Sequence, residues 1–574
     1  MYPAAIVYAH SNEDVKKAIN CAVQNGHSVS ARGGNHNLQG LGAMHGYVVI
    51  DTRLMCSPDD FIIDRTTLAG SKHIFDQNVI GTMKLQAGCP MGVVNSAMNK
   101  YFAPSEGALT VYSYCPSISI GGFLIGGGSG DQTPYLGWGI DVLHEIDITL
   151  YDGSEVTASE EQNSDLFWAL RGGGPGLGIV TDVTMKIVES PPPRDVSAER
   201  KFLHVKVQFD VSDSEKANQF SAAFQHFMYD FDPIVSTKFG GMGSKSALHH
   251  FLIGHYLGSW EEFVEDWTDA GLFYENFAGP DAYESVLYQN YEVQTSHSLP
   301  SKGVIVTEFD SYPEVWALRV CDADLMGVAP GRSIRRTFNL CADLGLDDEL
   351  CNEVKGVGFG NAPSTFTIYN PDCNKKEVIE TLVKNGYDIN SVINRSGLHP
   401  KYVEQVIATP GNEDLDIVEL RLSMKDSTYH GVLLPRLEVE TFADIFRNSS
   451  FYHATHFQYG APIMVPDDST AFAQRDTGIM LYLPFKEGRD FVFKALLEDD
   501  AYGGDASKLQ GYINYLGPKG NPNWRKFYFG DKYDKLQMVK EIYDPMDVFG
   551  KPNTIELPPP SEKACKEEVK NSKK

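Results

Sequence analysis

Three glycine-rich segments within the first 181 residues constrain the fold of this chain most strongly. They are Arg32-Gly-Gly-Asn-His-Asn37, Gly121-Gly-Phe-Leu-Ile-Gly-Gly-Gly-Ser-Gly130 and Arg171-Gly-Gly-Gly-Pro-Gly-Leu-Gly-Ile-Val-Thr181. Because glycine has no Cβ, it adopts positive φ easily and lets backbone N–H groups approach an anion. One such segment indicates only a tight or flexible turn. Three of them, each beside an apolar run, predict a backbone cradle for the diphosphate of a nucleotide.

The spacing of these glycines disfavours two common nucleotide-binding folds. None of the segments has the Gly-x-Gly-x-x-Gly register of a nicotinamide-binding Rossmann domain, and none ends in Lys followed by Ser or Thr. A nicotinamide dehydrogenase and a P-loop triphosphatase are therefore both disfavoured. The sequence predicts a different kind of nucleotide cradle.

The composition is typical of a globular protein, with 42% hydrophobic and 22% charged residues. Acidic residues outnumber basic ones by 76 to 49, and the net charge of -27 repels nucleic acid and anionic lipid surfaces. No apolar run approaches the roughly 18 residues of a membrane span. We therefore expect neither a nucleic-acid nor a membrane partner. The N-terminal sequence lacks the pattern of a secretory signal peptide.

The cysteines and histidines predict no metal site. The nine cysteines have no Cys-x-x-Cys spacing, which also argues against a dense disulfide scaffold, and their odd number leaves at least one without an intramolecular disulfide partner. The clustered histidines lack a carboxylate or cysteine at complementary spacing. These histidines are His249, His250, His255, His453 and His456.

Residues 1–190 alternate helical and strand patterns. Ser11-Asn-Glu-Asp14 is a capping box that predicts a helix with Val15, Ile19, Ala22 and Val23 on one face. Residues 29–34 and 47–52 are predicted strands, and residues 146–158 form a predicted hairpin that turns at Asp152-Gly153. This pattern is typical of an α+β domain.

Successive prolines in residues 190–194 interrupt regular structure and predict a domain boundary. Strand-like runs then recur between helical segments, which predicts a second α+β domain built on an antiparallel sheet. The runs are residues 202–210, 247–257, 417–424 and 477–485. We expect domains at 1–190 and 195–500, a third segment at 501–556, and a disordered polar tail at 557–574.

The three glycine segments together resemble the FAD-binding domain of the berberine bridge enzyme-like oxidoreductases, in the vanillyl-alcohol oxidase superfamily. Residues 29–40 resemble the family's strand and diphosphate loop, which places His36 where the family attaches the flavin 8α-methyl. Residues 115–130 resemble its second signature, which places Cys115 where the family bonds flavin carbon 6. The resemblance implies FAD held by two covalent bonds.

Matches later in the chain extend this resemblance. Residues 166–187 resemble a helix and strand that contact the nucleotide, Tyr512-Ile-Asn-Tyr515 resembles the element that meets the flavin from the other side, and 459–476 resembles the carbohydrate-oxidising branch. The implied fold is α+β, with a two-part PCMH-type FAD-binding domain and an inserted substrate domain on an antiparallel sheet. The implied cofactor-binding residues, besides His36 and Cys115, are Arg32, Gly33, Gly34, Asn35, Asn37, Ile118, Gly121, Gly122, Gly126, Gly178, Ile179, Val180 and Asn514.

Three residues depart from the family pattern. Asn35 stands where glycine is usual beside the histidine, Phe123 where histidine is frequent, and Gln474 where histidine precedes Arg475. Asn35 adds a side chain at a point where glycine normally permits close approach to the phosphates.

The resemblance implies oxidation of a hydroxyl group or anomeric carbon, most simply of a sugar, with hydride transfer to FAD. Tyr515 is the implied catalytic base. Because its isolated pKa is about 10, it needs an acidic partner or a cation to activate it. Ile118 stands where the family carries a smaller residue when oxygen reacts quickly, which favours a dehydrogenase over an oxidase. The electron acceptor is O2 or another molecule.

Two alternatives remain open at this point. The family also contains oxidative cyclases and alcohol oxidases of secondary metabolism, and a flavoprotein with a binding role and little turnover belongs to another functional class. The sequence determines neither the substrate, the oligomeric state nor the compartment, although the resemblance is compatible with secretion.

Overall fold

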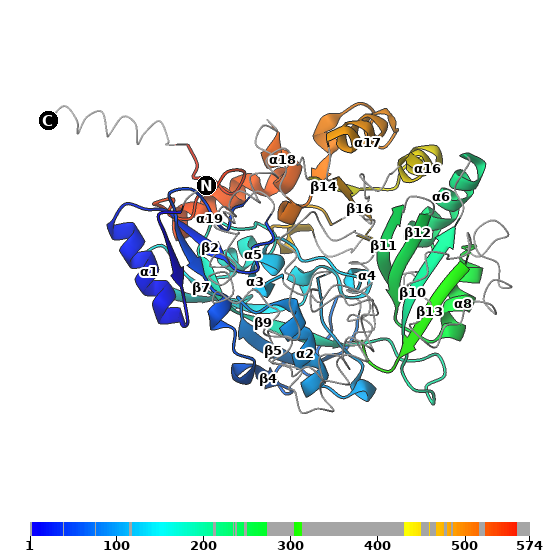
Figure 1. Ribbon diagram of the computed structural model, residues 1–574, viewed down its shortest axis with the longest axis horizontal. Helices are drawn as coiled ribbons and strands as arrows, with labels where there is room; N and C mark the ends of the chain where they lie inside the picture. The colour runs from blue at the N-terminus through cyan, green and yellow to red at the C-terminus, as the bar shows by residue number, and fades with distance from the viewer. Residues whose placement is uncertain are drawn as a thin grey trace, which may run out of the picture.

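A computed structural model describes residues 3–37, 40–74, 76–113, 118–209, 214–232, 235, 238–245, 250–272, 303–312, 430–448, 458–459, 467–475, 479–483, 486–515 and 523–559. Figure 1 shows the N-terminal elements and the C-terminal helix α19 on one side, and the sheet of β10 to β13 on the other. The predicted strand at 417–424 and the tail from residue 560 lie outside the described residues.

The chain begins with a small parallel sheet in the order β1-β3-β2, formed by Ala5–Tyr8, Val48–Asp51 and Val29–Arg32. Helix α1 (Asn12–Gln24) begins after Ser11, whose side chain accepts a hydrogen bond from the Asp14 backbone N–H. Val15, Ile19 and Ala22 are buried in the core that α1 shares with this sheet. The predicted capping box, helix and two strands are therefore confirmed.

A larger antiparallel sheet lies next along the chain. Its main path is β4-β5-β9-β7-β8, and β6 pairs with the end of β9. The strands are β4 (Ile62–Asp64), β5 (Val79–Gln86), β6 (Ala108–Leu109), β7 (Leu143–Thr149), β8 (Glu155–Ala158) and β9 (Ile179–Glu189). The hairpin of β7 and β8 confirms the predicted turn, and Gly153 has the positive φ of 78° that such a turn needs.

Short helices and a disulfide border this sheet. The helices are α2 (Met91–Tyr101), α3 (Ile120–Ile125), α4 (Thr133–Leu136) and α5 (Ser164–Leu170). Cys56 and Cys89 form a disulfide across a sequence separation of 33 residues. Among the described cysteines, the remaining one is the exposed Cys21.

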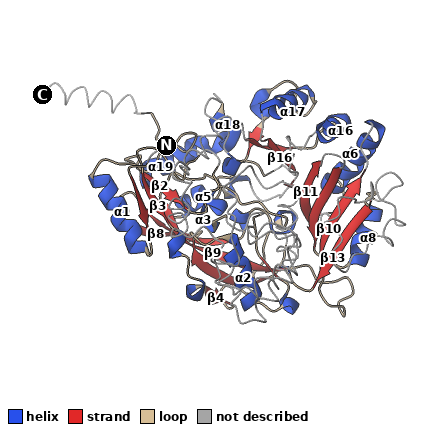
Figure 2. Ribbon diagram, viewed as in Figure 1, coloured by secondary structure: helices blue, strands red, loops and turns tan. Residues whose placement is uncertain are grey.

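The middle of the chain forms two further antiparallel sheets (Figure 2). The first has the order β11-β12-β10-β13 (Phe239–Lys245, His250–Tyr256, Phe202–Phe209 and Gly303–Phe309) and carries α6 (Ser214–Tyr229) and α8 (Trp260–Asp269). The second has the order β15-β16-β14-β17 (Gln458–Tyr459, Ile479–Leu483, His430–Leu434 and Gln510–Gly511), with α16 (Val439–Asn448) and α17 (Lys486–Glu498). Helices α6 and α16 pack through Phe220 and Phe446, whose ring centroids are 4.8 Å apart. These sheets confirm the predicted α+β class.

The C-terminal segment returns to the first part of the chain through α18 (Trp524–Phe529) and α19 (Tyr533–Tyr543). The buried Lys540 ammonium donates to the Gly176 carbonyl at 2.8 Å, and the Val29 N–H donates to the Val548 carbonyl at 2.8 Å. Segments more than 360 residues apart in sequence are therefore joined by direct hydrogen bonds. In Figure 1, α19 lies beside α5 and the N-terminal sheet.

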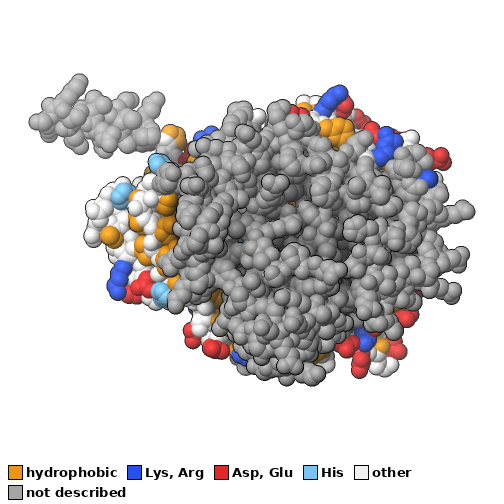
Figure 3. Space-filling model, in the orientation of Figure 1, with side chains coloured by type: hydrophobic (Ala, Val, Ile, Leu, Met, Phe, Trp, Pro, Cys, Tyr) orange, Lys and Arg blue, Asp and Glu red, His pale blue; other side chains and the backbone are white. Residues whose placement is uncertain are grey.

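The described helices include none that is long and apolar enough to cross a membrane. Figure 3 shows acidic side chains interspersed with basic ones around the described edge of one face.

Candidate cofactor site

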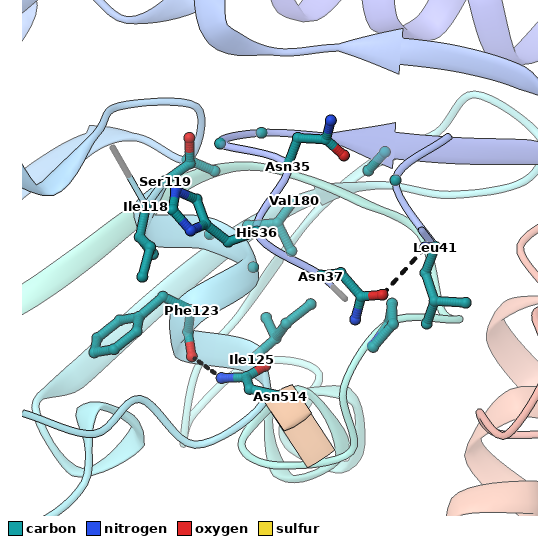
Figure 4. A pocket seen from close by; sticks show the side chains of 18 of the residues that line it. Asn35, His36, Asn37, Leu41, Ile118, Ser119, Phe123, Ile125, Val180 and Asn514 are labelled. Carbon is teal, nitrogen blue, oxygen red and sulfur yellow. Dashed lines mark hydrogen bonds between the residues drawn. The ribbon is translucent and has the colours of Figure 1, made fainter. Parts of the chain in front are cut away.

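A cavity lies where the glycine-rich segments meet the C-terminal segment (Figure 4). Its walls come from the loop after β2, the start of α3, the region before and within β9, and the segment that follows β17. Residues on these walls are Arg32, Gly33, Gly34, Asn35, His36, Asn37, Ile118, Ser119, Gly121, Gly122, Phe123, Ile125, Ser129, Pro175, Gly178, Val180, Tyr512, Ile513, Asn514 and Lys551.

The loop after β2 turns sharply to reach this cavity. Asn35 has a φ of 60°, in the left-handed region that asparagine tolerates better than most residues other than glycine. This conformation explains how asparagine can replace the usual glycine. The Asn37 carboxamide oxygen accepts a hydrogen bond from the Leu41 N–H at 3.1 Å, which closes the loop on itself.

The loop packs directly against the start of α3. A Cβ on Gly33 would lie 2.7 Å from the Cβ of Ser119, so glycine is needed for this close approach. Figure 4 shows the His36 imidazole on the side of the cavity where Ile118 and Ser119 lie. Cys115 lies outside the described residues, and the chain resumes at Ile118, three residues later.

The Ile118–Ser119 segment is held from behind by the turn that contains Cys89. The Ser119 hydroxyl donates to the Gly88 carbonyl at 2.9 Å, and the Ile120 N–H donates to the Cys89 carbonyl at 2.9 Å. Because Cys89 is also tied to Cys56 by the disulfide, this wall is braced by both hydrogen bonds and a covalent link.

The opposite wall is formed by residues that follow β17. The Asn514 carboxamide N–H donates to the Phe123 carbonyl at 2.9 Å and to the Tyr512 hydroxyl at 3.0 Å. The Tyr512 hydroxyl also accepts from the Gly128 N–H at 3.0 Å, and burial holds the Tyr512 pKa above its usual value. Tyr512 is therefore a neutral hydrogen-bonding group that ties the second glycine segment to the C-terminal segment.

Strand β9 presents alternate residues to the two sides of its sheet. Gly178 and Val180 lie on the cavity wall, whereas the Ile179 side chain is fully buried in the core beside α1. This alternation is the ordinary period of a β-strand. The Ile179 side chain therefore does not reach the cavity, although its neighbours do.

A second connection joins the middle of the chain to the region of the second glycine segment. Arg475 donates to the Asp141 carboxylate at 2.8 Å, and both side chains are buried. Gln474 donates through its carboxamide to the Tyr528 carbonyl at 3.0 Å. The Gln474 carboxamide N–H thus binds the backbone of α18. Gln474 stands at the position where the family pattern predicted histidine.

Most of the predicted cofactor residues lie around this one cavity. Gly126 instead packs against the Asn514 carboxamide, and Tyr515 ends the short 3-10 helix η10 (Ile513–Tyr515). Sequence reasoning missed several wall residues, notably Ser119, Ser129, Pro175 and Lys551, because none of them stands out by residue type or spacing. Among the described residues, no group of three histidine, cysteine or acidic side chains could hold a metal ion.

The polar atoms of the cavity suit a large polar cofactor such as FAD. The Arg32 Nε and both polar atoms of the Asn35 carboxamide are buried without a hydrogen-bond partner. Unsatisfied buried polar groups are costly, so they indicate a ligand that would complete them. The glycine backbone supplies further N–H donors for a diphosphate.

The chain contains an FAD binding domain, matched over residues 3–159, and a segment of the berberine and berberine-like family, matched over residues 511–556. These two matches cover the His36 loop and the Asn514 wall of the cavity. The predicted resemblance to the berberine bridge enzyme-like oxidoreductases, and the predicted FAD cofactor, are therefore confirmed at the level of these domains.

Relatives and solved structures agree with this assignment. The FAD-linked oxidoreductase pynB of Aspergillus niger is 27% identical over 50% of this chain and 46% of its own length. Glucooligosaccharide oxidase of Sarocladium strictum is 32% identical over 33% of this chain and 34% of its own length. The chain thus matches less than half of the length of each of these two relatives.

The likeness in three dimensions extends over nearly the whole chain. A structure of glucooligosaccharide oxidase from Acremonium strictum, described with a 6-S-cysteinyl, 8α-N1-histidyl FAD, covers 97% of this chain and 92% of that chain, with a TM-score of 0.58 and 18% identity. This similarity confirms the fold, including the inserted domain with antiparallel sheets.

Proposed function

We propose that this protein is an FAD-dependent oxidoreductase that oxidises a hydroxyl group or anomeric carbon of a carbohydrate. The observation that carries the proposal is the close packing of the His36 loop against the Ile118–Ser119 wall, through Gly33 and Ser119. Cys115 precedes this wall by only three residues. His36 lies on the cavity wall, and Cys115 comes shortly before the Ile118–Ser119 wall in sequence, which supports the proposal.

We propose two covalent bonds to FAD, through His36 and Cys115. The glucooligosaccharide oxidase structure described above has a 6-S-cysteinyl, 8α-N1-histidyl FAD, which supports this assignment. The backbone N–H groups of the loop at Gly33 and Gly34 would bind the diphosphate, and Asn514 would border the flavin from the opposite wall. Bound FAD supplies the two-electron acceptor, and the protein supplies position and electrostatics.

Removal of hydride from a carbinol carbon requires that the hydroxyl proton leave as well. Alkoxide is inaccessible near neutral pH, so a positioned base contributes about 10²- to 10⁴-fold in rate. We propose Tyr515 as this base, on the strength of its place in the Tyr-Ile-Asn-Tyr element. The side chain of its neighbour Asn514 is held by hydrogen bonds to the Phe123 carbonyl and the Tyr512 hydroxyl.

Sugar oxidation is favoured over the alternatives by the oligosaccharide oxidases among the relatives and structural neighbours. Whether O2 can serve as the final electron acceptor depends on whether it can reach the flavin. Ile118 lies on the cavity wall, and its extra methylene relative to valine would restrict oxygen. We therefore propose that the protein reacts slowly with O2 and is a dehydrogenase with another acceptor.

We also propose which parts of the chain bind FAD and which bind the substrate. Residues 1–190 and 501–556 would bind FAD, and residues 195–500 would bind the substrate. Strand β9 ends at Glu189 and β10 begins at Phe202, which supports a boundary in the proline-rich segment between them.

Oxygen consumption and reduction of an artificial acceptor should be measured with a panel of mono- and oligosaccharides. Turnover with sugars mainly in the acceptor assay is the expected result. Rapid peroxide formation would overturn the dehydrogenase assignment, whereas no turnover with any sugar in either assay would overturn the carbohydrate assignment. Acid precipitation separately tests attachment, because flavin left in the supernatant contradicts a covalent bond.

A further inference from the structure

Among the described residues that line the cavity, Arg32 and Lys551 are the lysine or arginine side chains, and their electrostatic surroundings differ. Arg32 lies 3.5 Å from the buried Asp51 carboxylate, measured from Nε to Oδ2. The same carboxylate pairs more closely with Arg53, at 2.5 Å, so it compensates the Arg32 charge only in part. Lys551 also lies on the wall, but it forms no ion pair with a carboxylate among the described residues. Lys551 thus offers a second positive charge to an anionic ligand, beside the partly compensated charge of Arg32.

The turn after α19 holds Lys551 in place. The Asp544 carboxylate accepts hydrogen bonds from the Val548 and Phe549 backbone N–H groups, both at 2.9 Å. The Lys551 ammonium donates to the Phe549 carbonyl at 3.0 Å and to the Val29 carbonyl at 3.5 Å. Val29 begins β2, the strand that leads into the His36 loop. An ammonium group has three N–H donors, so one further acceptor can bind.

The carboxylates nearest to this turn are already engaged. Asp544 and Asp547 both form ion pairs with the buried Lys540 ammonium, the latter at 2.9 Å. Burial of the Lys551 ammonium and repulsion from Lys540 lower the Lys551 pKa to about 7, against weaker attraction from the two aspartates. A charged ammonium in this position is costly until an anion joins it.

We propose that Lys551 binds the diphosphate of FAD, an inference that rests on FAD being the ligand proposed above. In this arrangement the glycine segments supply neutral N–H donors, and Lys551 of the C-terminal segment adds a positive charge to that of Arg32. Hydrogen bonds between charged partners are stronger than neutral ones, so Lys551 would contribute a large share of the affinity for the nucleotide half of FAD. The C-terminal turn would thereby be part of the nucleotide site.

The test compares ADP and adenosine, which differ only in the diphosphate. Binding of each to the apoprotein of the full chain is measured by calorimetry for wild type, Lys551→Met and Lys551→Arg. We expect Lys551→Met to weaken ADP binding by about 10- to 100-fold. Adenosine binding should be unchanged, and Lys551→Arg should restore most of the ADP affinity because it restores the charge.

Lys494→Met is the matched control, because the Lys494 side chain on α17 is 76% exposed and pairs, within the described part of the chain, with Glu498 on the same helix. It should leave both affinities unchanged. As a second readout, the FAD concentration needed for half-maximal covalent incorporation should rise by a similar factor in Lys551→Met.

Equal ADP affinity and equal FAD requirement in wild type and Lys551→Met would overturn the proposal. A parallel loss of adenosine binding would also overturn it, because it would indicate a general disturbance of the cavity. These outcomes are separable from failure of the proposed function. FAD binding that depends on Lys551 without any sugar oxidation would contradict the carbohydrate assignment alone, whereas a wild-type chain that binds no FAD would contradict both.

Discussion

Gly126 and Asn514 are in such close contact that a Cβ on residue 126 would overlap the Asn514 carboxamide. The two residues come from opposite ends of the chain, since Gly126 follows α3 and Asn514 lies in η10. The Asn514 carboxamide is further held by the Phe123 carbonyl at 2.9 Å. The glycine at the end of α3 is therefore required by the C-terminal segment, in addition to any role toward the cofactor.

Replacement of Gly126 by alanine should displace Asn514 and separate the two walls. We expect a loss of about 1–3 kcal/mol in the free energy of unfolding, as in other overpacked sites, together with weaker retention of FAD. Thermal and urea unfolding measure the stability. Gly122→Ala is the control for stability alone, because a Cβ there meets no protein atom within 4 Å, although Gly122 also lines the cavity. Equal destabilisation by both variants would contradict this explanation.

The two proposed flavin bonds make separable predictions. Cys115→Ala and His36→Ala should each retain flavin in the acid-precipitated protein, because the other residue still holds it. The double variant should release flavin on denaturation. Flavin fluorescence of the precipitate and supernatant, with intact mass of the protein, measures this. Complete release from either single variant would show that only one bond exists.

Tyr515→Phe should slow substrate oxidation by about 10²- to 10⁴-fold while FAD stays attached. Phenylalanine preserves most of the shape but lacks the phenolate oxygen that would accept the proton. Anaerobic reduction of the flavin by sugar, followed by stopped-flow absorbance, isolates this step from the acceptor reaction. Tyr512→Phe serves as a comparison, because Tyr512 is held by Gly128 and Asn514. An unchanged reduction rate in Tyr515→Phe would exclude it as the base.

Ile118→Val should accelerate the reaction of reduced enzyme with O2. Removal of one methylene from the cavity wall opens space beside the flavin, and a rise of about tenfold corresponds to about 1.4 kcal/mol in the barrier. The rate of flavin reduction by substrate should change little, which provides the internal control. Rapid reaction of the reduced wild-type enzyme with O2 would contradict the assumption that Ile118 restricts oxygen.

His73 should make the fold sensitive to acid. Burial lowers the His73 pKa from 6.5 to about 4, and its Nε2 is hydrogen-bonded to the Leu136 carbonyl at 2.8 Å. Between these two pKa values the unfolded chain binds more protons, so stability decreases as pH falls from about 6.5 to about 4. The contribution lost is about 3 kcal/mol at most.

Urea unfolding at several pH values between 7 and 4 tests this prediction. His73→Gln keeps an N–H donor for the Leu136 carbonyl but does not titrate, so its stability should depend less on pH over this range. His27→Gln is the control, because His27 is exposed. A pH dependence identical in wild type and His73→Gln would assign the acid sensitivity to other groups.

Local patterns predicted a large part of the fold. The helix after Ser11, strands β2 and β3 and the β7–β8 hairpin followed from capping, apolar runs and a turn dipeptide, which depend on neighbours in sequence. The order of strands did not follow from such patterns. Strand β9, for example, lies between β5 and β7 because of pairing between distant residues.

In the candidate site, too, local sequence patterns predicted some residues, and contacts between distant residues decided others. His36, Asn37 and Gly178 were expected from their glycine-rich motifs, and they lie on the cavity wall. Lys551 was not expected, because it occurs in a polar loop and gains its position from Val29, more than 500 residues away in sequence. The side of β9 that faces the cavity likewise became clear only from the packed sheet.

The order of amino acids was enough to predict a backbone cradle for a nucleotide, because this depends on residue type within short segments, and the family resemblance of these segments predicted FAD. Covalent attachment through His36 and Cys115 stays a prediction. Tertiary structure decided which of these segments share a cavity, which glycines must remain glycine and where positive charge lies. Those properties arise from contacts such as Gly126 with Asn514 and Lys551 with Val29. Such contacts form only when the C-terminal segment folds back on the first domain, which no short stretch of sequence encodes.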